Sequence, residues 1–223
     1  MRLVNLVCHP RVLKITGQRN IAVEHDPFIL ALNHSQKVEA PLMGGLVGHL
    51  RGGKMVRFIA DWNLLLVPGV SIVYHAGQVI ILDRKPAKPA FLNIFRRWLT
   101  HKMPASERAE QLIDRGHCIG IYPEGTTNKD PKKLLRGFFG AAQLSIKKGV
   151  PVVPGGIRFP LNDGSRPINE LEPMEIEFGE AMPPPVVSEK PARRDVVNFH
   201  AAIMQEISRL SGKSWQPKSS RQK

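Results

Sequence analysis

Short apolar runs alternate with longer helical patterns along most of the chain. The short runs stop at polar residues or at glycine, which is typical of buried strands. They cover residues 28–32, 55–60, 79–82, 118–122, 150–154 and 174–178. Because proline cannot donate to a strand ladder, Pro151 and Pro154 predict that their strand lies at a sheet edge or carries a bulge.

Apolar residues recur at helical spacing between these runs, most clearly in the amphipathic pattern of residues 89–99. Helices are expected over 39–50, 89–99, 104–115, 138–148 and 192–210. Strands that alternate with helices predict a single α/β domain, with a mainly parallel or mixed sheet flanked by helices on both faces.

The end of the chain departs from this pattern. Gly212 follows the last periodic helix, and KSWQPKSSRQK over 213–223 carries four cationic side chains and no acidic one. We therefore expect a domain over residues 1–211 and a basic, disordered tail over 212–223.

Charge narrows the classes of partner. Thirty-two Lys and Arg against 19 Asp and Glu give a net charge of +13, which favours nucleic acid, an anionic membrane surface or phosphorylated substrates. A nucleic-acid surface would gain support from basic stripes interleaved with aromatic residues, but aromatic residues make up only 6% and the basic pairs are scattered. Composition alone does not decide between these partners. The two cysteines, Cys8 and Cys118, form no CxxC pair, and Pro68 interrupts the longest apolar stretch. Neither a thiolate metal site nor a membrane-spanning helix is predicted.

The first candidate chemistry follows the strand over 28–32, where an α/β sheet opens its ligand crevice. His34 stands there, and Glu39 is the first acid after it. A carboxylate at this distance can accept a hydrogen bond from one imidazole nitrogen, which leaves the other nitrogen as a base. The alternative is a helix-capping glutamate beside a surface histidine.

Two more polar clusters also follow strands. Asp83 and Arg84 end the strand over 79–82, and the planar guanidinium suits phosphate oxygens. In Tyr-Pro-Glu-Gly-Thr-Thr over 122–127, a glycine flanked by hydroxyls lets backbone N–H groups approach a phosphate. The three clusters are expected to converge at one sheet edge.

These blocks resemble the glycerophospholipid acyltransferases, the PlsC-like or 1-acylglycerol-3-phosphate acyltransferase group. Residues 33–39 are similar to the N-H-x4-D motif of that family, and residues 77–84 to its second block, a glycine and an apolar strand that closes with Asp-Arg. Residues 122–127 match the third block, F-P-E-G-T-R, except at the ends, and residues 150–154 resemble the proline-bounded fourth. All four occur in the family's order.

The resemblance implies an acyltransferase-type fold and an activity. A fatty acyl group would pass from acyl-CoA or acyl-ACP to the hydroxyl of a glycerol-based lysophospholipid, with His34 as general base and Glu39 as the acid that orients it. Acyl carrier protein is thus a candidate partner, and neither a metal nor a cofactor is implied. The acceptor site would comprise Asn33, Arg84, Glu124, Gly125, Thr126 and Thr127.

Two residues depart from the family's motifs. Glu39 replaces the usual Asp, which moves the carboxylate one methylene further out. Thr127 replaces the arginine that ends the third block and so removes one phosphate-binding cation. A phosphodiester lysolipid, or an acceptor with another head group, thereby gains weight over lysophosphatidate.

The apolar stretch over residues 58–70 suits attachment to a membrane surface. Trp62 stands near its start, and Arg51, Lys54 and Arg57 are close in the sequence, so the stretch is expected either to enter the headgroup region or to form an ordinary core helix. We expect a cytoplasmic enzyme that is peripheral to an anionic membrane and has no nucleic-acid partner. The runner-up is a non-catalytic lipid-binding or scaffold protein of the same fold.

Overall fold

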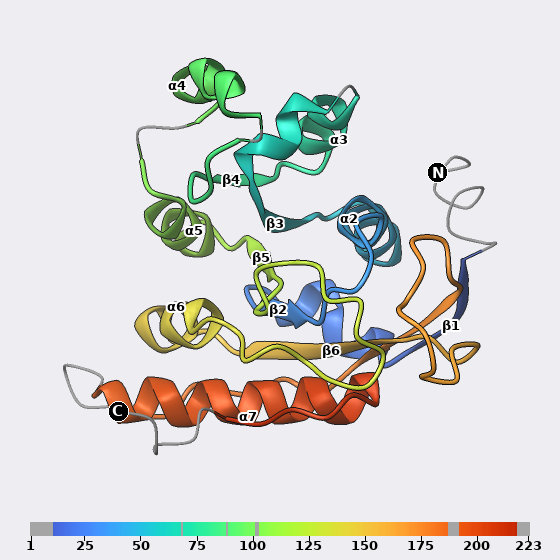
Figure 1. The fold of residues 1–223 in the computed structure, drawn as a ribbon. Helices are drawn as coiled ribbons and strands as arrows, with labels where there is room; N and C mark the ends of the chain where they lie inside the picture. Colours follow the sequence, from blue (N-terminus) through green and yellow to red (C-terminus); the bar gives the residue numbers. More distant parts are fainter. Residues whose placement is uncertain (1–10, 68, 88, 101–102, 187–191, 218–223) are drawn as a thin grey trace, which may run out of the picture.

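The alternating pattern folds into a seven-stranded sheet with helices on its two faces (Figure 1). The computed structural model describes residues 11–67, 69–87, 89–100, 103–186 and 192–217. The strands are β1 (Val12–Thr16), β2 (Ile29–Leu32), β3 (Val56–Asp61), β4 (Ile80–Leu82), β5 (Cys118–Ile121), β6 (Val152–Arg158) and β7 (Met174–Phe178). Their order is β1-β7-β6-β2-β5-β3-β4, and every pair is parallel except β6 with β7. The predicted α/β class and mainly parallel sheet are confirmed.

Strand β2 lies at the centre of the sheet, which explains why its sequence is apolar at every position. All four residues of β2 are fully buried. Leu30 and Leu32 belong to a core cluster on one face, whereas Ile29 and Ala31 belong to a cluster on the other. A strand that is covered on both faces reads as a continuous apolar run.

The α-helices are α2 (Glu39–Leu50), α3 (Val70–Ala76), α4 (Arg96–Leu99), α5 (Ala105–Asp114), α6 (Gly140–Lys148) and α7 (Arg193–Ser211). Four 3₁₀ helices complete the described elements: η1 (Gln18–Ile21), η2 (Val23–His25), η3 (Trp62–Leu66) and η4 (Ala90–Phe95). Helix α2 contributes to the core on one face, and α6 and α7 to the core on the other. None of the helices in the described residues is both long and apolar enough to cross a membrane.

The expected edge position of the fourth block is wrong, because β6 lies between β7 and β2. Pro154 is paired with Ala31 of β2, and its carbonyl accepts from Gly179 N on the opposite side. The register of β6 with β7 begins one residue later, at Gly155. The missing N–H of Pro154 therefore falls outside that ladder, and the proline is tolerated inside the sheet.

The predicted helix over 89–99 forms in a different way. It divides into η4 and the single turn of α4. The Asn93 side chain bonds the backbone that precedes it through both of its amide groups, since it accepts from Ala87 N at 2.9 Å and donates to Ala90 O at 2.7 Å. Such local bonds compete with helical ones and favour the tighter 3₁₀ geometry.

The stretch over 58–70 does not place Trp62 at a membrane. Trp62 is fully buried, and its indole N–H donates to Lys85 O at 2.9 Å. The stretch is the end of β3 followed by η3, and Trp62 anchors η3 to the segment after β4. Insertion of Trp62 into a bilayer is therefore excluded for this fold.

The first part of the expected tail is packed on the domain. Gly212 ends α7 with a positive φ of 70°, and Lys213 behind it is only 3% exposed. Ser214 N donates to Lys132 O at 2.8 Å, and Ser214 O accepts from Leu134 N at 2.9 Å. Residues 213–215 thus belong to the fold. Residues 218–223 of the expected tail lie outside the described residues, as does Cys8.

Candidate active site

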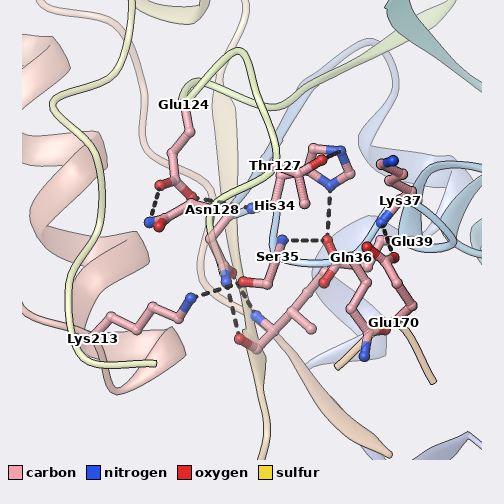
Figure 2. A network of polar contacts seen from close by, with 12 residues as sticks. His34, Ser35, Gln36, Lys37, Glu39, Glu124, Thr127, Asn128, Glu170 and Lys213 are labelled. Carbon is pink, nitrogen blue, oxygen red and sulfur yellow. Dashed lines mark hydrogen bonds and ion pairs between the residues drawn. The ribbon is translucent and has the colours of Figure 1, made fainter. Parts of the chain in front are cut away.

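The first and third blocks meet because β2 and β5 are neighbouring parallel strands. The turn after β2 and the loop after β5 leave the same end of the sheet, as expected for polar clusters that follow parallel strands. The backbone N–H of His34 donates to the Glu124 carboxylate at 3.2 Å, which joins the two loops directly (Figure 2).

His34 and Glu39 form a close pair inside the turn after β2. Nδ1 of His34 lies 2.8 Å from Oε2 of Glu39, and the backbone N–H of Ser35 donates to the same oxygen at 2.7 Å (Figure 2). The Glu39 side chain is fully buried, whereas that of His34 is 13% exposed. Burial raises the pKa of Glu39, against the opposing effect of its hydrogen bond with His34. The extra methylene relative to the family's Asp therefore does not break the contact.

The other ring nitrogen of His34, Nε2, is not engaged by Glu39. With the Glu39 carboxylate as acceptor, Nδ1 of His34 carries the proton and Nε2 keeps its lone pair. The nearest polar side chain is that of Thr127, with Oγ1 at 3.4 Å from Nε2. The ring stacks on Tyr122 with centroids 4.3 Å apart, which fixes its plane.

Arg84 joins the second block to the third. Its guanidinium donates to Gly125 O at 2.9 Å and lies 4.7 Å from the centre of the Phe138 ring. Gly125 has a φ of +64°, and a Cβ there would approach the Phe138 ring to 2.6 Å, so only glycine fits. Thr126 and Arg84 are exposed and Thr127 is half-buried. These four residues of the expected acceptor site lie together at the surface beside His34.

The two other residues expected in the acceptor site, Asn33 and Glu124, point inward. The Asn33 amide is fully buried and pairs with the backbone of Ile157 in both directions, at 3.0 and 2.7 Å. The Glu124 carboxylate is 3% exposed and also accepts from Asn128 Nδ2 at 2.7 Å and Leu135 N at 2.8 Å. Both side chains hold loops in place, and neither offers a polar atom to a lipid head group.

Sequence reasoning missed three residues of this network. Ser35 holds Glu39 through its backbone, Asn128 holds Glu124, and the ammonium of Lys213 donates to Ser35 Oγ at 2.8 Å (Figure 2). Ser35 lies inside the first block and Asn128 directly follows the third, so their positions next to the candidate residues could have identified them. Lys213 stands 178 residues away from Ser35, and nothing local marks it. Within the described part of the chain, no three His, Cys, Asp or Glu side chains gather as a metal site would require.

All four sequence blocks fall within the match of this chain to one protein family. The family model described as Acyltransferase matches residues 12–158, which include all four blocks. A chloroplastic 1-acyl-sn-glycerol-3-phosphate acyltransferase of Brassica napus is 24% identical over 141 residues, 63% of this chain and 35% of the relative. A 1-acyl-sn-glycerol-3-phosphate acyltransferase of Borreliella burgdorferi is 28% identical over 98 residues, 43% of this chain and 33% of the relative. The chain thus spans about a third of the length of these curated relatives.

The fold is also that of a solved structure. The 1-acyl-sn-glycerophosphate acyltransferase PlsC from Thermotoga maritima superimposes with a TM-score of 0.62 at 18% identity. The similarity covers 93% of this chain and 76% of that one. At this identity the likeness concerns the fold alone.

Proposed function

The chain belongs to the acyltransferase family, and on this basis we propose that it moves a fatty acyl group from an acyl thioester to the hydroxyl of a glycerol-based lysophospholipid. The observation that carries the proposal is the pair of His34 and Glu39, in which Nδ1 is held at 2.8 Å from the carboxylate and Nε2 lies 3.4 Å from Thr127 Oγ1. The names of the curated relatives support the same reaction class.

The reaction needs one base and a leaving thiolate. Nε2 of His34 takes the proton of the acceptor hydroxyl as its oxygen attacks the thioester carbonyl, so that a C–O bond forms. The tetrahedral intermediate then breaks its C–S bond, and the proton on Nε2 passes to the departing thiolate. Glu39 stabilises the imidazolium that forms between these two steps, because the buried carboxylate stays in contact with Nδ1.

The acceptor's phosphate would lie against the exposed guanidinium of Arg84 and the turn at Gly125 and Thr126. Arg84 donates one hydrogen bond to Gly125 O, and its other N–H groups could donate to phosphate oxygens. Thr127 places a neutral hydroxyl beside Nε2 where the family's third block ends in arginine. This position therefore favours an acceptor with a singly charged phosphodiester over lysophosphatidate. Acyl-CoA or acyl carrier protein would supply the thioester, and the reaction needs no cofactor.

Mass spectrometry of the lipid products is the test of this function. The purified chain is given an acyl-CoA or an acyl-ACP, with a panel that contains lysophosphatidate, lysophosphatidylglycerol and lysophosphatidylethanolamine. We expect a product heavier by one acyl group with at least one acceptor, and release of one free thiol for each product. Thiol release without any acylated lipid would contradict the proposal.

A membrane surface is the expected source of such an acceptor. Trp62 is buried and cannot contact that membrane, but another part of the structure exposes apolar side chains that could. We name the exposed side chains of Phe91, Ile94 and Trp98 the η4–α4 face; they are 66%, 63% and 66% exposed. Arg97 lies over the Trp98 ring at 5.2 Å, and Arg96 forms an ion pair with Asp83 at 2.6 Å. Aromatic side chains mixed with arginine are typical of segments that enter the headgroup region of anionic bilayers.

The position of this face supports the same interpretation. Asp83 precedes Arg84, so the ion pair of Asp83 with Arg96 ties the η4–α4 face to the acceptor site. A lysolipid in the bilayer surface would then have its phosphate close to Arg84 without leaving the membrane. We propose that the η4–α4 face contacts anionic lipid.

Vesicle co-sedimentation tests this face. Phosphatidylcholine vesicles with and without phosphatidylglycerol are compared for the wild-type chain, for Phe91→Ser/Ile94→Ser/Trp98→Ser, and for a control with two other exposed leucines replaced, Leu161→Ser/Leu171→Ser. We expect wild type and control to bind anionic vesicles and the triple variant to lose the part of binding that resists salt. Equal binding by all three would overturn the proposal. A triple variant that instead changes the oligomeric state would assign the face to contacts between copies.

A further inference from the structure

Lys213 lies beneath the turn that carries His34 and Glu39. It follows α7 directly, and its side chain runs inward to place Nζ 2.8 Å from Ser35 Oγ (Figure 2). The residue is 3% exposed. Burial of a lysine is costly unless its charge is balanced and its ammonium is hydrogen-bonded. The buried position of Lys213 therefore needs a physical explanation.

That reason lies in the carboxylates around it. Glu39 and Glu124 are 0% and 3% exposed, and both stabilise the charged form of Lys213, with Asp130 as a third contributor. Burial has the largest effect and lowers the pKa of Lys213, whereas Glu124 has the strongest opposing influence. The charged groups that face Lys213 are therefore the acid partner of His34, the acid that holds the backbone of His34, and Asp130.

Ser35 connects this cation to the catalytic pair. Its hydroxyl accepts from Lys213, and its backbone N–H donates to the same Glu39 oxygen that contacts His34. A continuous series of contacts thus runs from Lys213 through Ser35 and Glu39 to His34. A change in the charge or position of the first member affects the last.

We propose that Lys213 is a positioning residue of the active site, which fixes Ser35, and through it Glu39, and places a buried positive charge next to the pair of Glu39 and His34. The proposal rests on the acyl transfer proposed above, because it gives that reaction its base in the right state. It also gives a part of the chain outside the four blocks a role in the site.

The pH dependence of the reaction separates this role from simple packing. Lys213→Met keeps the aliphatic stem and removes the charge. Without the cation, Glu39 and His34 bind protons more readily, so the acidic limb of kcat/KM moves to higher pH. On that limb, a shift of about one pH unit lowers the rate about tenfold. Lys213→Arg keeps the charge and should return the acidic limb most of the way to its wild-type pH. Lys14→Met, which removes an exposed lysine on β1, should leave it unchanged.

A readout without substrate keeps this proposal apart from the acyl transfer itself. The titration midpoint of the His34 ring signals in NMR should rise in Lys213→Met and return toward that of wild type in Lys213→Arg. Midpoints that stay equal in all three proteins would overturn the role of Lys213 even in an active enzyme. A shifted midpoint in a protein without transferase activity would support the positioning role of Lys213 and would contradict the proposed acyl transfer.

Ser35→Ala is the second variant, in case the Met variant does not fold. It removes the hydroxyl that holds Lys213 but keeps the charge nearby. We expect a lower kcat at every pH, with the acidic limb where wild type has it and both KM values unchanged. A Ser35→Ala protein with wild-type kcat would show that the contact positions nothing.

Discussion

The turn after β2 and the η4–α4 face depart from the usual distribution of polar and apolar side chains in opposite directions. Around His34, charged groups lie inside the protein, and Glu39, Glu124 and Lys213 are all almost fully buried. On the η4–α4 face, large apolar side chains lie outside. Buried charges and exposed aromatic residues both cost free energy in an isolated domain, so each arrangement needs a compensating role.

The two regions differ in how that cost is met. Glu39 contacts His34 and accepts from the backbone N–H of Ser35, and Glu124 accepts from two backbone N–H groups of the loops, so the first region finds most of its partners inside the fold. The apolar side chains of the second region have no such cover, since Phe91 and Trp98 are each 66% exposed. The difference fits the two proposals made above, in which the first region performs the chemistry and the second contacts an external surface.

The largest expected effect is on the free energy of unfolding, for which buried Trp62 in η3 is compared with exposed Trp98 on the η4–α4 face. Trp62→Ala should lower the free energy of unfolding by about 3–5 kcal/mol, because it removes a fully buried indole and leaves a cavity. Trp98→Ala should change it by no more than about 0.5 kcal/mol, since that ring is exposed. Urea unfolding measures both. Equal losses would mean that the η4–α4 face is part of the core.

A second comparison concerns the acid beside His34. Glu39→Ala should reduce kcat about 10²-fold, because the imidazole loses both the partner that orients it and the charge that stabilises its protonated form. Glu39→Asp, which restores the residue usual in the family, should keep much of the rate. Steady-state kinetics with a saturating thioester measures these effects. A fully active Ala variant would assign Glu39 to the start of α2 alone.

The exposed side of the site is tested by Arg84→Ala. We expect the KM of the acceptor to rise about tenfold, as for the loss of one charge-assisted hydrogen bond, with little change in the KM of the thioester. Arg84→Lys should fall between the two because it keeps the charge but not the planar fork. If both KM values rise equally, Arg84 serves mainly to hold Gly125.

The smallest effect is expected for Thr127→Arg. The new cation beside Nε2 should improve the use of lysophosphatidate relative to lysophosphatidylglycerol about threefold, as for one exposed ion pair. The ratio is measured by competition between the two acceptors in one reaction. An unchanged ratio would place the acceptor's phosphate away from Thr127.

The sequence predicted the elements that position the site because their signals are local. The helix expected over 39–50 is α2, and the runs over 28–32 and 118–122 are β2 and β5 to within one residue. A run buried on both faces needs no partner to be recognised. The pairing of His34 with Glu39 was also predictable, since it spans five residues and one turn.

What was missed depends on long-range contacts or on side chains that act on the backbone. The inward position of Lys213 follows from packing against a turn 178 residues away, whereas its own neighbourhood reads as a basic tail. The 3₁₀ geometry of η4 follows from the side chain of Asn93, and the interior place of β6 follows from the strands around Pro154. Periodicity and composition carry none of this information.

The most direct test of the central claim is the rate at which His34→Ala acylates the preferred lysolipid, with folding checked by thermal unfolding. We expect a folded protein whose kcat is about 10²–10⁴-fold below that of wild type, because the variant lacks the base proposed for the attacking hydroxyl. A folded His34→Ala protein that still transfers acyl groups at nearly the wild-type rate would contradict it.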